Sequence, residues 1–303
     1  MKKYFFGISV VTAMIGATTM FSACSSDDEQ QQSPTSYLLS LDAEKAGYAD
    51  LDGKGTRAIT LSGEDIVTAW ESGDLVTVYD GSWQSKIGDL KPKEGSTGTT
   101  RTKLEGVIST TNLKAGDAMN LIYPRAIWQY TGQKGTFEDI AKNFDYITTG
   151  INVVYIDPSN TSNPVYSTTA LFGKAEQAIV RFTICDANDK ALAVPELTIT
   201  AAGNQLVKSC SLDGTATDKG GALVVTPASD TNVFYVAIRN DNPNPEDYTL
   251  TVKAGTQVYT YTKSKVTFER GSFYKVKVKM QYNDNTYTER DSYVNAGGEE
   301  VWQ

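Results

Sequence analysis

The sequence contains no histidine, only three cysteines and no basic cluster, and each scarcity removes a class of function. Without histidine there is no Ser-His-Asp or Cys-His catalysis, no histidine-ligated zinc and no histidine pH switch. A formal net charge of −8 argues against nucleic acid as a partner. A Ser-Lys dyad or a glycosidase-like carboxylate pair remains allowed, but no spacing selects one. We therefore expect no enzyme, no metal site and no cofactor.

Only one long apolar run occurs, and it lies at the start of the chain. Met-Lys-Lys is followed by a hydrophobic segment over residues 4–20 and then by Phe-Ser-Ala-Cys, which ends at Cys24. Lysines, a short apolar segment and small residues before a cleavage position predict a secretory signal peptide over residues 1–23. The last four residues resemble the bacterial lipobox, in which the acylated cysteine becomes the mature N-terminus. An ordinary signal peptide with a chance cysteine is the alternative.

The segment behind Cys24 is polar throughout. Residues 25–36 hold no apolar side chain except in Pro34, so residues 24–36 are expected to form a flexible acidic linker. The cluster Asp27-Asp28-Glu29 resembles the export signal of some Gram-negative lipoproteins. We therefore expect a protein anchored by lipid to the outer membrane and exposed at the cell surface, whereas a plain solvated linker is the alternative.

Beyond the linker, strand-like segments follow one another. The clearest is residues 272–280, in which one face carries Tyr274, Val276, Val278 and Met280 and the other carries three lysines. This period of two is typical of a half-buried antiparallel strand. Similar segments are Leu75–Tyr79, Met119–Tyr123, Val153–Ile156, Ile179–Ile184, Leu197–Thr200, Leu223–Thr226, Val233–Ile238, Tyr248–Val252 and Val258–Thr262.

The strand-like segments, about nine in each half, are too many for one sandwich. We predict an all-β protein with two tandem β-sandwich domains and few short helices, one of them between Phe137 and Phe144. A Ser-, Thr-, Asn- and Pro-rich stretch ends at Thr169, and the apolar pattern then restarts. The predicted domains are residues 37–170 and 171–280, followed by a tail over residues 281–303.

Apart from Cys24, the chain has two cysteines, Cys185 and Cys210. Each lies in or at the end of a strand-like run, and an oxidising export route permits a disulfide between them. Two isolated buried thiols are the alternative.

Three stretches together resemble the fimbrillin family, the subunits of type V pili and their relatives. They are Gly55-Thr56-Arg57-Ala58, the stretch Trp70-Glu71-Ser72-Gly73-Asp74 with the strand that follows it, and the apolar strand Leu171–Ile184. The resemblance implies transthyretin-like, Greek-key sandwiches and a structural role in a cell-surface fimbrium. The implied partners are other pilin subunits. A host or bacterial surface ligand is also implied, and the sequence does not distinguish shaft, tip and anchor roles.

The resemblance further implies proteolytic processing between Arg57 and Ala58. A trypsin-like protease would remove the first strand, expected over Leu38–Leu51, and a strand of another subunit would fill the groove. Arg101 is a less favoured cleavage position. The alternative is that Arg57 lies in an ordinary loop and that the chain keeps its first strand and its lipid.

The donor strand is sought at the C-terminus. Strand character and bulky side chains occur at Tyr287, Tyr293, Val294, Val301 and Trp302. The many acidic residues around them are equally typical of a frayed tail.

The motif at Trp70 has a physical interpretation of its own. Gly73 permits a tight turn and Asp74 can accept hydrogen bonds from nearby backbone, while Trp70 is expected to pack in the core. The alternative function is a monomeric, lipid-anchored surface protein that binds carbohydrate through exposed aromatics such as Trp83 and Trp128.

Overall fold

The computed structural model describes residues 33–46, 57–62, 65–124, 127–282, 293–294 and 300–302. For 57–62, 65–68 and the segments after residue 282 only the backbone is described. The chain divides into two units, Met1–Ser33 and Pro34–Gln303, and nearly all described residues belong to the second. The predicted signal peptide and Cys24 lie outside the described residues.

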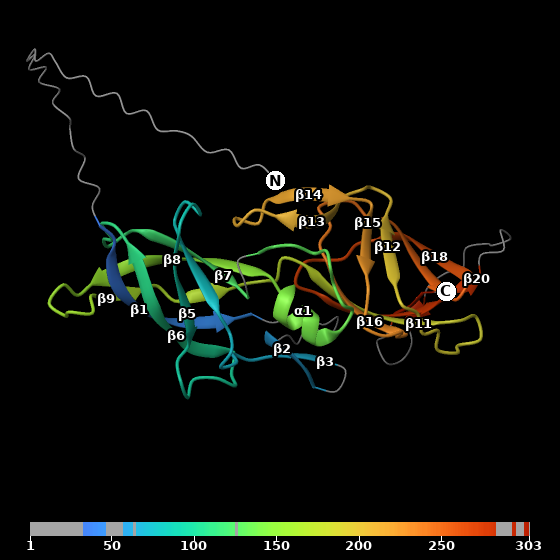
Figure 1. Cartoon of the computed structure of the whole chain (residues 1–303), viewed down its shortest axis with the longest axis horizontal. Helices are drawn as coiled ribbons and strands as arrows, with labels where there is room; N and C mark the ends of the chain where they lie inside the picture. Colours follow the sequence, from blue (N-terminus) through green and yellow to red (C-terminus); the bar gives the residue numbers. More distant parts are fainter. Residues whose placement is uncertain are drawn as a thin grey trace, which may run out of the picture. The chain divides into compact units, whose positions relative to one another are not determined.

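Eight of the strands between residues 35 and 172 form one sheet that closes on itself (Figure 1). Its order is β10-β1-β6-β5-β4-β7-β8-β9, and β9 also pairs with β1, so seven of the eight strands make a ring. The members are β1 (Thr35–Lys45), β4 (Val76–Asp80), β5 (Lys86–Pro92), β6 (Arg101–Thr110), β7 (Ala118–Tyr123), β8 (Ile147–Ile156), β9 (Pro164–Ser167) and β10 (Ala170–Phe172). Closure leaves no open edge within the ring.

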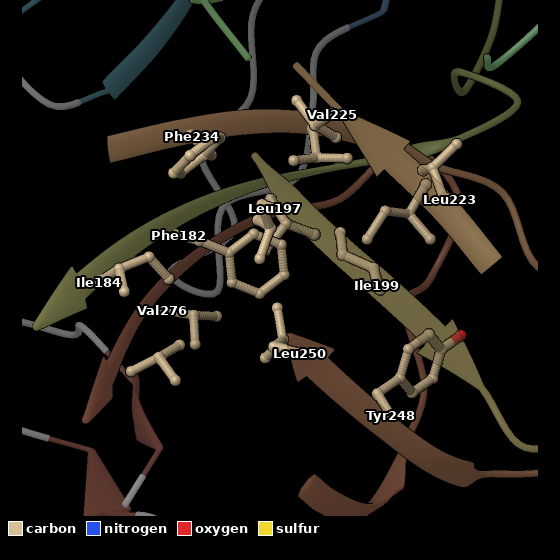
Figure 2. Packing of buried hydrophobic residues seen from close by; sticks show 14 of the residues in the cluster. Phe182, Ile184, Leu197, Ile199, Leu223, Val225, Phe234, Tyr248, Leu250 and Val276 are labelled. Atoms are coloured by element: carbon tan, nitrogen blue, oxygen red, sulfur yellow. The ribbon is translucent and has the colours of Figure 1, made fainter. Parts of the chain in front are cut away.

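Ten of the described strands from residue 178 onward form two five-stranded sheets. One has the order β16-β11-β19-β22-β21 and the other β15-β12-β17-β18-β20. Their bounds are β11 (Ala178–Cys185), β12 (Leu197–Ala201), β15 (Ala222–Val225), β16 (Val233–Ile238), β17 (Glu246–Ala254), β18 (Gln257–Val266), β19 (Phe273–Lys279), β20 (Gln281–Tyr282), β21 (Tyr293–Val294) and β22 (Glu300–Trp302). Figure 2 shows side chains of both sheets pointing toward one another, Phe182 and Val276 from one and Ile199 and Leu250 from the other.

Three smaller elements complete the described chain. They are the hairpin β2 (Arg57–Ser62) and β3 (Asp65–Thr68), the hairpin β13 (Leu206–Cys210) and β14 (Ala216–Gly220), and the helix α1 (Phe137–Asn143). The helix begins after Thr136, whose side chain accepts a hydrogen bond from the Asp139 amide, and it buries Phe137 and Ile140.

The all-β prediction is confirmed, and so are the short helix and the alternation along β19, in which Val276 and Val278 are fully buried, as is Met280 just after the strand. The prediction that this strand is antiparallel is wrong, because β19 pairs in parallel with β11 and with β22. The sandwich expected for residues 37–170 is replaced by a closed sheet, because β9 returns to pair with β1. The boundary near residue 170 stays a prediction. It falls within β10, which pairs with β1 and so belongs to the first sheet.

Candidate functional site

The first strand, β1, is an integral part of the closed sheet. It pairs antiparallel with β6 over ten residues, from Thr35 opposite Thr110 to Glu44 opposite Arg101. On its other side it pairs in parallel with β9 and then with β10. Its amides and carbonyls therefore face partners on both sides, so removal of β1 would open two sheet edges.

Every second side chain of β1 points into the core. Tyr37, Leu39, Leu41 and Ala43 are buried, and Leu39 is fully so. They share one cluster with residues of the neighbouring strands, Leu104 and Ile108 from β6, Val165 from β9, and Ala170 and Phe172 from β10. Burying a leucine side chain is worth about 1.5–3 kcal/mol, so the two buried leucines of β1 together contribute about 3–6 kcal/mol.

The predicted removable strand, Leu38–Leu51, lies only partly within the described residues. The strand ends at Lys45, and residues 47–51 lie outside the described part of the chain. Of the three leucines expected to form its apolar part, Leu39 and Leu41 are buried, whereas Leu38 is 40% exposed and lies opposite the exposed Val107.

A buried lysine occupies the end of β1. The Lys45 side chain is 2% exposed, and its Nζ lies 2.8 Å from Oδ2 of Asp74. The same nitrogen lies 3.7 Å from the centre of the Trp70 ring and 3.9 Å from the centre of the Tyr123 ring. A carboxylate and two aromatic faces thus surround one ammonium group, an arrangement that compensates for its lost hydration. We call Trp70, Asp74 and Tyr123 the lysine pocket.

The turn predicted at Gly73 builds this pocket. The Asp74 amide donates to the Glu71 carbonyl at 3.1 Å, and the Glu71 amide donates to Oδ2 of Asp74 at 3.0 Å. The Tyr123 hydroxyl donates to the other carboxylate oxygen at 2.8 Å. The prediction that Asp74 accepts a hydrogen bond from nearby backbone is therefore confirmed, and Trp70 is fully buried as expected.

Sequence reasoning missed Lys45. The signal was available, because Lys45 has the same parity as Leu39, Leu41 and Ala43 in an alternating strand and should therefore point inward. A lysine on the inward side of a strand needs a carboxylate partner, and the nearby Trp-Glu-Ser-Gly-Asp turn is where one is found.

The predicted processing position lies at the beginning of β2. Arg57 pairs with Thr68 of β3, and the register of this hairpin shifts between Arg57 and Thr60. A cut between Arg57 and Ala58 would break the covalent connection between β1 and the remaining strands. Cleavage itself stays a prediction. Arg101, the less favoured position, begins β6, and its backbone lies opposite Glu44 of β1.

The C-terminal segments pair with their own chain. β22, which contains Val301 and Trp302, pairs in parallel with β19 and antiparallel with β21, which contains Tyr293 and Val294. These residues thus extend the edge of one five-stranded sheet, and their role as a donor strand stays a prediction. Tyr287 lies outside the described residues.

Cys185 and Cys210, between which the sequence permitted a disulfide, are both free thiols. Cys185 ends β11, and its thiol donates to the Val278 carbonyl, with 3.4 Å between sulfur and oxygen. Cys210 belongs to the β13–β14 hairpin and accepts a hydrogen bond from Arg239 at 3.3 Å. The two residues lie on strands of different sheets. Burial raises the pKa of the Cys210 thiol to about 11, although the Arg239 charge lowers it.

The aromatics proposed for sugar binding are also placed differently. Trp128 is buried and stacks on Tyr146, and Trp83 is half-buried beside Tyr79. The exposed aromatic pair is instead Tyr155 on β8 and Tyr166 on β9, whose rings stack with centres 5.9 Å apart.

The described residues lack two kinds of feature. They contain no helix long and apolar enough to cross a membrane. Nor do they contain a group of three or more His, Cys, Asp or Glu side chains arranged to hold a metal ion.

Comparison with known proteins gives distant likenesses. No family model and no curated protein matches this chain. A fimbrial assembly protein from Parabacteroides distasonis ATCC 8503 is similar in structure, with a TM-score of 0.39 and 14% identity over 80% of this chain and 91% of that chain. A variant of the shaft pilin SpaA from Lactobacillus rhamnosus GG has a TM-score of 0.33 and 11% identity, over 82% of this chain and 97% of that chain.

Proposed function

We propose that this protein is a structural, non-enzymatic subunit of a cell-surface fimbrium or a related adhesin, assembled by protease-triggered strand exchange. In this proposal the chain is exported and then anchored to the outer membrane by a palmitate-type lipid on Cys24. Cleavage between Arg57 and Ala58 frees β1, and a strand from another pilin subunit takes its place. The observation that carries the proposal is that β1 fills the core of a closed sheet and precedes the processing position.

Loss of β1 would create a strong acceptor. It would leave β6 unpaired on one side and β9 and β10 on the other, with Leu104, Val165 and Phe172 exposed between them. Unpaired edges over an uncovered core bind an added strand through backbone hydrogen bonds and side-chain pockets. The same features hold β1 in place until a competing strand arrives.

The test is the intact mass and the oligomeric state of the chain from Cys24 to Gln303, before and after limited trypsin. We expect one early cut after Arg57, followed by ladders of oligomers that lack the β1 fragment. Arg57→Ala should give neither. Arg101→Ala is the matched control, because it removes an arginine that is 77% exposed but should leave the early cut unchanged.

Two outcomes would contradict the proposal. In one, Arg57 resists cleavage under conditions that leave the fold intact. In the other, the cut chain stays monomeric and keeps its β1 fragment at high protein concentration. A truncation after Tyr282 separates the two roles of the chain, since it removes β21 and β22 as donors but leaves the acceptor strands unchanged.

A monomeric, lipid-anchored carbohydrate-binding protein is the second candidate. The observation in its favour is the exposed pair Tyr155 and Tyr166, which are 52% and 53% exposed on neighbouring strands. Aromatic faces open to solvent can pack on the apolar face of a sugar ring. A glycan array with the uncut chain, and a Tyr155→Ala and Tyr166→Ala double variant, tests this candidate. Loss of glycan binding in the double variant would support it.

A further inference from the structure

We propose that the lysine pocket fixes the register of whichever strand occupies the β1 position, and that a strand replacing β1 has to bring a lysine to it. The first part concerns the uncut chain. The second part rests on the strand exchange proposed above, and it requires a donor other than residues 283–303 of a second copy, because these residues contain no lysine. The ligand class is therefore a primary ammonium on an extended strand, placed eight residues after the first inward-facing side chain, as Lys45 follows Tyr37.

Apolar alternation alone cannot fix the register of β1. A slip by one residue would turn the outward side chains into the core, so alternation excludes it. A slip by two residues keeps the inward side chains inward, and at the apolar positions it only replaces one apolar side chain by another. In either direction, however, it would move Lys45 out of the pocket, and in one direction it would bring Ala43 into it. The lysine therefore excludes the slips that alternation permits.

The geometry of the pocket favours a compact cation. The rings of Trp70 and Tyr123 are inclined at 68° with centres 5.7 Å apart, and Nζ of Lys45 lies within 4 Å of both centres. A small charge in such a corner is attracted by two ring faces at once. A planar guanidinium can lie flat on only one of them, so lysine and arginine are not equivalent here.

The carboxylate makes the pocket selective against neutral strands. Asp74 is 12% exposed, so an uncharged side chain at this position would leave a poorly hydrated negative charge without its cation. Removing one partner of a buried ion pair is strongly destabilising for this reason. A strand with an acidic residue at this position would be rejected by like-charge repulsion.

The first experiment measures binding of synthetic β1 peptides to the chain cut after Arg57. The probe is a labelled peptide of residues 34–46, in competition with unlabelled variants. We expect Lys45→Met to bind about 10- to 100-fold more weakly and Lys45→Arg to fall in between. Asp42→Asn is the matched control, because Asp42 is 73% exposed and its charge lies outside the core. Equal binding of the wild-type and Lys45→Met peptides would overturn the inference.

A second measurement uses the uncut chain and does not depend on exchange. Urea unfolding of Lys45→Met, Asp74→Asn and the double variant forms a cycle, and we expect the double variant to lose clearly less than the sum of the single losses. Additive losses would overturn the register role. If the cut chain binds no wild-type peptide but the losses in the cycle are not additive, the proposed strand exchange is wrong and the role of the lysine pocket in the uncut chain is supported. An intact mass lower by one water, with Lys45 joined to Asp74 by an amide, would overturn the second part of the inference. A covalently bound Lys45 could not leave the pocket to be replaced by the lysine of another strand.

Discussion

Replacing Leu39 by alanine tests whether β1 is part of the folded core or a strand laid on its surface. Leu39 is fully buried at the middle of β1, opposite Gly106 of β6 and beside Val165 of β9. Removing three carbons from a rigid core site costs about 2–5 kcal/mol, and the cost rises with the cavity that remains.

The surroundings of Leu39 place the expected loss in the upper part of this range. The residue opposite is a glycine and cannot extend into the cavity. A Cβ added at Gly106 would lie 2.1 Å from the Asp89 carbonyl oxygen, so this part of β6 is tightly packed against β5. Ladder bonds on both sides of β1 also prevent its backbone from moving inward. We therefore expect Leu39→Ala to lower the free energy of unfolding by about 3–5 kcal/mol.

Leu38→Ala is the matched control, since it removes the same atoms one residue earlier from a side chain that is 40% exposed. Its expected cost is below about 1 kcal/mol. The assay is urea unfolding of the uncut chain, followed by tryptophan fluorescence, with the slope of the transition compared between variants. Equal shifts for both variants would refute the placement of β1 in the core, and with it the acceptor groove.

Three further predictions concern charged and sulfur-containing side chains near β13. Arg239 is 5% exposed and ion-paired with Asp241, so Arg239→Met should lower the free energy of unfolding in urea by about 2–3 kcal/mol. The control Arg270→Met, at a side chain that is 45% exposed, should lower it by less than about 1 kcal/mol. Although burial raises the pKa of Asp241, the charges of Arg239 and Lys219 lower it further, below its ordinary 3.8. Its contribution to stability is therefore present above about pH 4 and lost as the pH falls further, and Asp241→Asn should flatten acid unfolding below about pH 4; an unchanged profile would contradict this. Because burial raises the pKa of Cys210 to about 11, its thiol should react slowly with maleimide at neutral pH until the chain unfolds, and fast labelling of the native chain would contradict its placement.

Local pattern predicted much of the fold. The alternation in residues 272–280 identified β19 and its buried face, and the spacing of Phe137 and Ile140 identified α1. These elements depend on near neighbours in the chain, so a short window contains their signal. The turn at Gly73 was predictable for the same reason.

Closure of the sheet could not be predicted in this way. It depends on the pairing of Leu38 with Pro164 and of Leu39 with Val165, which are far apart in the chain. Alternation identifies inward faces but does not say which strands are neighbours, so a sandwich and a barrel give the same pattern. The cysteines illustrate the same limit, because two strand positions for Cys185 and Cys210 say nothing about whether their strands meet.

The hydrogen bonds that shape the lysine pocket have their donors and acceptors outside β1. Trp70 is held by its own amide on the Thr99 carbonyl and by its indole nitrogen on the Thr100 carbonyl, at 2.8 and 3.2 Å. Asp74 is held by Glu71 and Tyr123. None of these four hydrogen bonds involves β1, so the pocket would keep its form when β1 leaves. A preformed anionic pocket beside an open sheet edge would bind a lysine-bearing strand at low ordering cost and reject strands without one.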